Sequence, residues 1–222
     1  MSIQTNLTKI LDEIPQHVKL IAVSKTMPPS DIMEAYNSGH LYFGENKVQD
    51  LAVKQAVLPT DIQWHFIGHL QSNKVKFIAA FVSLIESVDS LKLLKEINKQ
   101  ALKNDRTIDC LLQFHIAKEY EKFGLDLAEA KILLESNDFA EMQNIRVIGL
   151  MGMATFTDDL GVVSKEFRTL KEYFSCIKTE YFPDQESFAE ISMGMSGDYK
   201  IAIEEGSTMV RIGSLIFGAR NK

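Results

Sequence analysis

The amino-acid sequence predicts an α/β fold, a (β/α)8 TIM barrel formed as a single domain by residues 1–222. Three observations predict this fold. Short apolar runs alternate with longer amphipathic runs along the whole chain. The alternation gives eight strand–helix units, which in 222 residues favours a closed barrel over an open sheet. No low-complexity tract or linker rich in Pro, Gly or Ser divides the chain.

Eight apolar, β-branched segments are predicted as strands because they are too short for buried helices. These segments span residues 18–25, 41–46, 63–68, 82–88, 108–116, 145–151, 188–193 and 209–213. Strands that alternate with helices in this way are expected to be parallel, with right-handed crossovers.

The segments between the strands have the composition and periodicity of amphipathic helices. Ser30 is the predicted N-cap of a helix over residues 31–37, which ends at Gly39. Asp126 and Glu129 predict a capping box at the start of a later helix. Further helices are expected over residues 48–57, 73–80, 91–101, 127–134, 167–177, 199–204 and 215–219.

An open, doubly wound sheet is the alternative to the barrel. Such a sheet usually carries a glycine-rich dinucleotide fingerprint directly after its first strand. Residues 24–28 of this chain read Ser-Lys-Thr-Met-Pro at that place. The sequence therefore favours the barrel.

Composition argues against several classes of partner. The net charge is −6 and no basic stripe is present, so nucleic acid is not expected. No apolar segment is long enough to span a membrane, and the N-terminus resembles no targeting signal. Cys110 and Cys176 have no metal-ligand spacing. A reduced, cytoplasmic protein is the expectation.

Lys25 directly follows the first predicted strand, and it would therefore lie at the end of the barrel where active sites are found. An apolar environment disfavours a charged ammonium group and lowers its pKa, which activates a lysine for Schiff-base formation. The alternative is an ordinary solvated lysine in a loop.

Two small-residue turns follow the last two predicted strands, Ser196-Gly197 and Gly213-Ser214. Loops at these positions commonly bind phosphate in such barrels, because their backbone N–H groups face the anion. The alternative is that small residues are needed there only for tight turns. Together with Lys25, the two turns favour a ligand that carries both a phosphate and a carbonyl group.

The sequence also resembles a known family, the YggS/PROSC family of pyridoxal-phosphate-binding proteins, or pyridoxal phosphate homeostasis proteins. The matching motifs occur in order along nearly the whole chain. They are residues 22–26, 43–46, 64–74, 87–89, 149–153, 192–196 and 202–220. The resemblance implies a barrel similar to the N-terminal domain of alanine racemase and pyridoxal 5′-phosphate as the cofactor.

The resemblance also assigns roles to individual residues. Lys25 matches the lysine that forms the Schiff base, and Arg211 matches the arginine that faces the pyridine nitrogen. Asn46 matches a residue beside the cofactor ring. The residues that match the phosphate site are Ser196, Gly213 and Ser214. An arginine does not give up its proton, so it would leave the pyridine nitrogen unprotonated and the cofactor a weaker electron sink.

Three departures from the family pattern concern residues near strands two and five. Lys47 stands where an aromatic residue is frequent, and His115 and Lys118 stand where Asn and small residues are usual. The stretch before the first strand is short, so a trimmed first helix is expected. None of these departures affects the predicted cofactor residues, but they leave ligand preference near these strands open.

Three functions remain open. The first is a non-catalytic protein that holds pyridoxal 5′-phosphate and delivers it to apo-enzymes, thereby affecting vitamin B6 and amino-acid balance. The second is a pyridoxal-phosphate-dependent amino-acid racemase, which needs an acid or base on each face of the substrate carbon. The third is a Schiff-base aldolase, which would reserve no residue such as Arg211 for a pyridine nitrogen. The resemblance favours the first, with no catalytic residue, and a monomer is expected because the racemase's dimer-forming domain is not apparent.

Two further patterns are interpreted as structural. His65 and His69 are four residues apart, but they straddle a strand end and Gly68 lies between them, so a metal pair is not expected. Met151, Met153, Met193 and Met195 are expected to line the core or a pocket.

Overall fold

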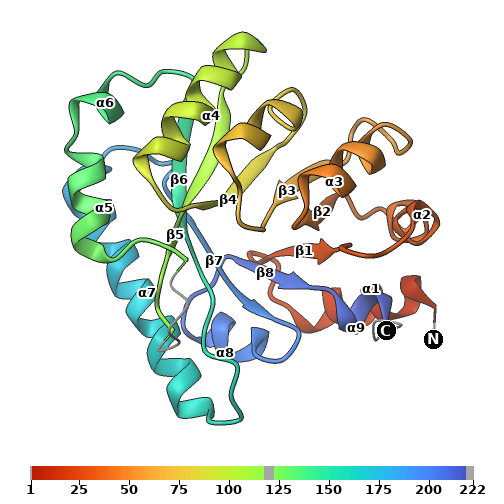
Figure 1. Cartoon of the computed structure of the whole chain (residues 1–222). Helices are drawn as coiled ribbons and strands as arrows, with labels where there is room; N and C mark the ends of the chain where they lie inside the picture. Colours follow the sequence, from red (N-terminus) through yellow and green to blue (C-terminus); the bar gives the residue numbers. More distant parts are fainter. Residues whose placement is uncertain (1, 118–122, 219–222) are drawn as a thin grey trace.

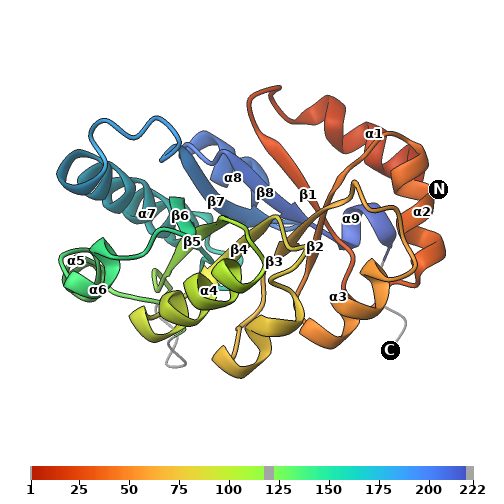
Figure 2. The same ribbon diagram turned by 90° about the horizontal axis from the view of Figure 1, so that it is seen from above.

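The computed structural model describes residues 2–117 and 123–218, which form a closed barrel with helices outside it (Figure 1). Its eight strands pair in chain order, and β8 pairs with β1. All eight pairings are parallel. Seen from above, the helices again surround the strands (Figure 2). The predicted (β/α)8 barrel is confirmed.

The strands lie close to their predicted positions but are mostly shorter. They are β1 (Lys19–Val23), β2 (Tyr42–Glu45), β3 (Gln63–Phe66), β4 (Leu84–Val88), β5 (Ile108–Phe114), β6 (Ile145–Gly152), β7 (Glu190–Met195) and β8 (Met209–Ile212).

The helices on the outside include α1, which was expected as a trimmed first helix without bounds, and α6, which was not predicted. The helices are α1 (Ile3–Glu13), α2 (Pro29–Asn37), α3 (Val48–Gln55), η1 (Ser72–Phe77), α4 (Leu91–Lys103), α5 (Leu127–Leu134), α6 (Asn137–Ala140), α7 (Leu160–Tyr181), α8 (Tyr199–Glu204) and α9 (Ser214–Phe217). The helix before the first strand, α1, has 11 residues, or about three turns.

Of the two helix starts that were predicted from capping residues, one is confirmed and one is wrong. The predicted capping box is present, because Asp126 accepts from the Glu129 backbone and Glu129 accepts from the Asp126 backbone. Ser30, however, is not the N-cap of α2. The helix begins one residue earlier, at Pro29, and Pro28 is the N-cap. Proline is favoured in the first turn because its fixed φ suits the helix and its missing N–H is not needed there.

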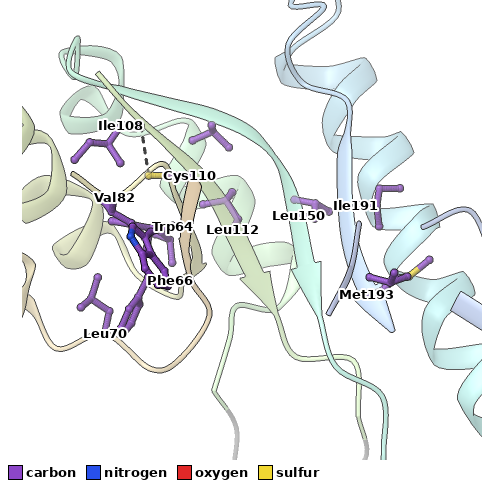
Figure 3. Close-up of a cluster of buried hydrophobic side chains, with 14 of the residues drawn as sticks. Trp64, Phe66, Leu70, Val82, Ile108, Cys110, Leu112, Leu150, Ile191 and Met193 are labelled. Atoms are coloured by element: carbon purple, nitrogen blue, oxygen red, sulfur yellow. Dashed lines mark hydrogen bonds between the residues drawn. The ribbon is translucent and has the colours of Figure 1, made fainter. Parts of the chain in front are cut away.

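The main hydrophobic core lies between the strands and the surrounding helices (Figure 3). Trp64 and Phe66 of β3 point to this side of the sheet, and Leu112 of β5 and Leu150 of β6 lie in the same core. All four side chains are at most 2% exposed. This close-packed core fixes the strands relative to the helices, and it therefore also fixes the positions from which the loops at the strand ends begin.

A second, smaller cluster lies on the opposite face of the strands, inside the barrel. It consists of Leu84, Leu111, Met151 and Met209, and it is almost completely buried. Side chains two residues apart on a strand share a face. Therefore the residues two positions further along these strands continue this barrel interior towards the carboxyl ends.

Among the described residues, none of the helices has both the length and the apolar character needed to cross a membrane.

Candidate functional site

A cavity of about 550 Å³ opens at the carboxyl ends of the strands. Its lining includes all six residues that the sequence predicts to bind a ligand: Lys25, Asn46, Ser196, Arg211, Gly213 and Ser214. These residues follow or belong to β1, β2, β7 and β8, which are neighbours in the closed sheet. The strand order therefore brings together residues that are up to 189 positions apart in the sequence.

Lys25 lies in a tight turn just beyond the end of β1. The backbone N–H of Met27 donates to the Ser24 carbonyl at 3.0 Å, which closes the turn. Thr26, the third residue of this turn, has a φ of 69°. A β-branched residue rarely adopts a positive φ, so the turn that presents Lys25 stores backbone strain. The Lys25 side chain is half-buried and lines the cavity.

A buried ion pair supports this turn from outside the barrel. The Lys54 ammonium of α3 lies 2.6 Å from a Glu45 carboxylate oxygen and donates to the Ser24 carbonyl at 2.8 Å. The Ser24 hydroxyl donates to the same Glu45 oxygen at 2.7 Å. Both ends of the ion pair are nearly inaccessible to solvent. The pair therefore fixes the first residue of the turn that carries Lys25.

Arg211 projects from β8 into the base of the cavity and is 4% exposed. Its Nη1 donates to the Ser192 hydroxyl at 2.5 Å, and its Nη2 donates to the Gly152 carbonyl at 3.0 Å. Burial lowers the pKa of the guanidinium, while the nearby carboxylates of Glu86 and Asp198 raise it. An arginine remains protonated under these conditions.

A buried carboxylate lies behind Arg211. The Ser192 hydroxyl donates to one Glu86 oxygen at 2.5 Å, and the His65 Nδ1 lies 2.7 Å from the other. Burial favours the protonated form of Glu86, but the hydrogen bond and charge of His65, the charge of Arg211 and the Ser192 hydroxyl together hold its pKa below the ordinary value. An ionised carboxylate thus lies beneath the cavity.

The two predicted phosphate turns lie next to each other in the cavity lining, because they follow the neighbouring strands β7 and β8. The Gly213 N–H donates to the Ser196 hydroxyl at 3.4 Å, which joins the loop after β7 to the loop after β8. Ser214 begins α9 directly after Gly213. A side chain at Gly213 would approach the Val23 carbonyl to 3.0 Å, so a residue without a side chain suits this position. The small residues of these two turns therefore place hydroxyl and backbone N–H donors close together in the cavity lining.

Asn46 is held at the cavity by the backbone of the neighbouring loop. A Cβ atom at Gly68 would collide with the Asn46 carbonyl, so only glycine allows the loop after β3 to pass this close. Both residues line the cavity. This contact explains the placement of Asn46 but leaves its role in ligand binding a prediction.

The two histidines that were considered as a metal pair have different partners. His65 is buried against Glu86, whereas the His69 Nδ1 lies 3.3 Å from Asp89 at the rim of the cavity. Among the described residues, no group of three or more His, Cys, Asp or Glu could hold a metal ion. Met151 and Met193 are core residues, and Met153 and Met195 line the cavity.

Two of the departures from the family pattern lie outside the cavity lining. Lys47 is the exposed N-cap of α3, and His115 is half-buried beyond β5. Lys118 lies outside the described residues.

Several site residues were missed by reasoning from the sequence. Glu45 and Glu86 are charged residues within otherwise apolar strand segments, and that pattern is a usable signal. Ser192 lies within the family motif at residues 192–196, but no role was assigned to it, because a single uncharged hydroxyl in a strand indicates no partner. His69 lies at the end of the third predicted strand and within the family motif, but no ligand-binding role was assigned to it, although it lines the cavity.

Comparisons with known proteins agree with this fold. Residues 1–221 match the model for "Alanine racemase, N-terminal domain". The structure superposes on alanine racemase from Clostridium difficile 630 with a TM-score of 0.74, covering all of this chain and 57% of the racemase. At 13% identity, this similarity shows the fold alone. The chain is thus a (β/α)8 barrel of the alanine racemase N-terminal type.

Full-length relatives identify the family more narrowly. The pyridoxal phosphate homeostasis protein of Aquifex aeolicus is 41% identical over 203 residues, 91% of this chain and 87% of the relative. The one from Haemophilus influenzae is 36% identical over 234 residues, 100% of this chain and 97% of the relative. PipY from Synechococcus elongatus PCC7942, solved with pyridoxal phosphate bound, has a TM-score of 0.88 and 34% identity, covering 98% of this chain and 100% of PipY. The chain belongs to the pyridoxal phosphate homeostasis protein family.

Proposed function

We propose that this chain binds pyridoxal 5′-phosphate in the cavity, as a Schiff base with the Lys25 amine, and takes part in intracellular pyridoxal phosphate homeostasis and amino-acid balance. One observation carries the proposal. Lys25, Arg211 and both serine turns line one cavity, in a chain whose relative PipY was solved with this cofactor bound.

The groups that line the cavity fit the chemistry of this cofactor. Bound pyridoxal 5′-phosphate supplies an aldehyde, a pyridine ring and a phosphate dianion. Lys25 provides the amine, and Arg211 provides a buried cation at the base of the cavity. Ser196, Ser214 and the open backbone at Gly197 provide hydroxyl and N–H donors for the phosphate.

The chemistry of Arg211 supports a protein that binds the cofactor without using it for catalysis. The guanidinium has only donors and keeps its proton, so it stabilises an unprotonated pyridine nitrogen and weakens the ring as an electron sink. We propose apo-enzymes that need pyridoxal phosphate as the recipients, the cytoplasm as the location and residues 1–222 as one functional unit.

A racemase remains the second candidate because of one observation. His69 lines the cavity, and its Nδ1 is oriented by Asp89, which leaves Nε2 available as an acid or base. Together with Lys25 it would give the cavity two proton-transferring groups.

The binding proposal is tested by visible absorbance. Purified protein with added pyridoxal 5′-phosphate is expected to show an imine band, and Lys25→Ala to lose it. Lys19→Ala is the matched control, because Lys19 pairs with Glu190 near the start of β1, outside the cavity lining. A protein that stays colourless, or a band unchanged in Lys25→Ala, would overturn the proposal.

The two candidate functions are separated by chiral analysis of amino acids incubated with the loaded protein. We expect no racemisation or transamination of common amino acids at a useful rate. Robust turnover that both Lys25→Ala and His69→Ala abolish would establish the racemase instead.

A monomer is proposed as the functional form. The barrel matches the full length of PipY but only 57% of the C. difficile racemase, so the further part of the racemase has no counterpart in this match. Sedimentation is expected to give a mass near the 25.1 kDa of one chain. A stable dimer at micromolar concentration would contradict this.

A further inference from the structure

A buried chain of polar side chains leads from the cavity into the barrel. We call His65, Glu86, Ser192 and Arg211 the Arg211 network. We propose that Glu86 is a positioning residue: through Ser192 it fixes the orientation of Arg211, and its charge balances the guanidinium that faces the cofactor. The inference rests on the proposed function, because it concerns how this chain prepares Arg211 for a bound pyridine ring.

The direction of each hydrogen bond in the network follows from the groups present. Arg211 can only donate, so the Ser192 hydroxyl must accept from it at 2.5 Å. The single hydrogen of Ser192 then points to Glu86, 2.5 Å away, because an ionised carboxylate can only accept. His65 Nδ1 donates to the other Glu86 oxygen at 2.7 Å for the same reason. The charge on Glu86 therefore sets the direction of the whole network.

The network leaves Arg211 partly available to a ligand. Within the described residues, its side chain donates one N–H to Ser192 and one to the Gly152 carbonyl. A guanidinium has five N–H donors, so three remain. Because Arg211 lines the cavity, these donors are the ones a bound ring can meet. Two fixed anchors hold the plane of the guanidinium, which determines where the remaining donors point.

Glu86 also supplies a buried negative charge close to Arg211. The Arg211 Nη1 lies 3.8 Å from a Glu86 oxygen, and both side chains are at most 3% exposed. Asp198 is the other carboxylate that acts on the guanidinium, and it also lines the cavity. His65 adds a donor on the far side of Glu86. A neutral side chain at Glu86 would release the Ser192 hydroxyl from its fixed direction and leave the guanidinium poorly balanced.

Equilibrium binding in four proteins tests this role: the unchanged chain, Glu86→Gln, Arg211→Met and the double variant. The dissociation constant for pyridoxal 5′-phosphate is measured by titration of the visible band, whose absorption maximum is recorded as well. Glu86→Gln is expected to raise the dissociation constant on the order of tenfold and to shift the maximum. In the Arg211→Met background the same change is expected to alter the constant less than about twofold, because Glu86 acts through Arg211.

Glu190→Gln is the matched control. Glu190 lies on the same strand as Ser192 and pairs with Lys19 and Thr208, outside the cavity lining. It is expected to leave the dissociation constant and the absorption maximum unchanged. If Glu86→Gln does not fold, Ser192→Ala takes its place in the same four-protein comparison, since it breaks the same link without removing a charge.

Two results would overturn the inference. One is an unchanged constant and maximum in Glu86→Gln, or in Ser192→Ala if that variant replaces it. The other is an equal loss of affinity with and without Arg211, which indicates a general structural role. Both differ from failure of the proposed function, in which the unchanged chain itself shows no band that depends on Lys25.

Discussion

Thr26 shows at the residue scale how the chain positions its lysine. Its positive φ follows directly after Lys25, and its hydroxyl donates to the Lys25 carbonyl at 2.5 Å. The carbonyl of Ser24, on the other side, is held by Lys54. Strain at such a position costs about 1–3 kcal/mol and persists only where surrounding contacts impose it. We interpret the strained turn as the device that presents Lys25 to the cavity.

Replacing Thr26 with glycine tests this interpretation. Glycine adopts a positive φ without strain but has more freedom in the unfolded chain, so a net stabilisation of about 1 kcal/mol is expected in urea unfolding. Affinity for pyridoxal 5′-phosphate is expected to fall, because the turn becomes looser. Asp105→Gly is the control, since Asp105 also has a positive φ but does not line the cavity. Equal affinity in Thr26→Gly and the unchanged chain would refute the interpretation.

Glu86 predicts a specific dependence of stability on pH. Its pKa in the folded chain is held below the ordinary value of 4.5. It therefore stabilises the fold above that value, and this contribution is lost as the pH falls through the folded pKa. At neutral pH, Glu86→Gln is expected to lower the unfolding free energy by about 3 kcal/mol, because it removes one partner of a buried ion pair.

The difference in unfolding free energy between the unchanged chain and Glu86→Gln is expected to shrink in urea unfolding as the pH falls below the ordinary value of 4.5. Asp198 changes the pH dependence of stability in the opposite direction, because burial raises its pKa. Its effect is common to both proteins and cancels in the difference. A difference that stays constant as the pH falls well below 4.5 would contradict an ionised, stabilising Glu86.

At the scale of elements, the first and last helices support the predicted phosphate turns. α1 packs against α9, and the two helices lie side by side in Figure 1. The Asn6 amide of α1 donates to the Ile216 carbonyl of α9 at 3.0 Å. The Tyr199 hydroxyl of α8 donates to Glu13 of α1 at 2.6 Å. α8 and α9 follow the two serine turns, so α1 anchors both sides of the predicted phosphate site.

Asn6→Ala is expected to cost about 1 kcal/mol of stability, the usual contribution of one hydrogen bond. Because α9 begins at Ser214, the preference for pyridoxal 5′-phosphate over pyridoxal is also expected to fall. Titration with both compounds measures this preference. Thr8→Ala is the control, because its hydroxyl bonds only within α1, to the Gln4 carbonyl. The same preference in Asn6→Ala as in Thr8→Ala would show that α1 does not support the phosphate turns.

The ends of helices could be predicted where a short sequence pattern alone determines them. The capping box at Asp126 is a local pattern and is present as predicted. The start of α2 was misplaced, because Ser30 suits an N-cap as well as the first turn, and Pro29 decided the boundary. α1 was expected only as a trimmed first helix without bounds, because it precedes the first repeat unit. α6 was not assigned, because it has only four residues.

At the scale of the whole molecule, the alternation of strands and helices was sufficient to predict the barrel. The rule that function lies at the carboxyl ends of the strands then placed Lys25, Asn46 and Arg211 near one another. The Arg211 network was not predictable in this way. The network depends on which residues of neighbouring strands face the barrel interior at the same level along the barrel axis. The register shift between β7 and β8 means that this alignment cannot be deduced from the sequence.

Chemical mapping of the modified lysine tests the central claim most directly. The protein is loaded with pyridoxal 5′-phosphate, reduced with borohydride, digested and examined by mass spectrometry. We predict one pyridoxyl adduct, on the peptide that contains Lys25, and no adduct on Lys19 or Lys54. An adduct spread over surface lysines, or a single adduct at another lysine, would contradict the account.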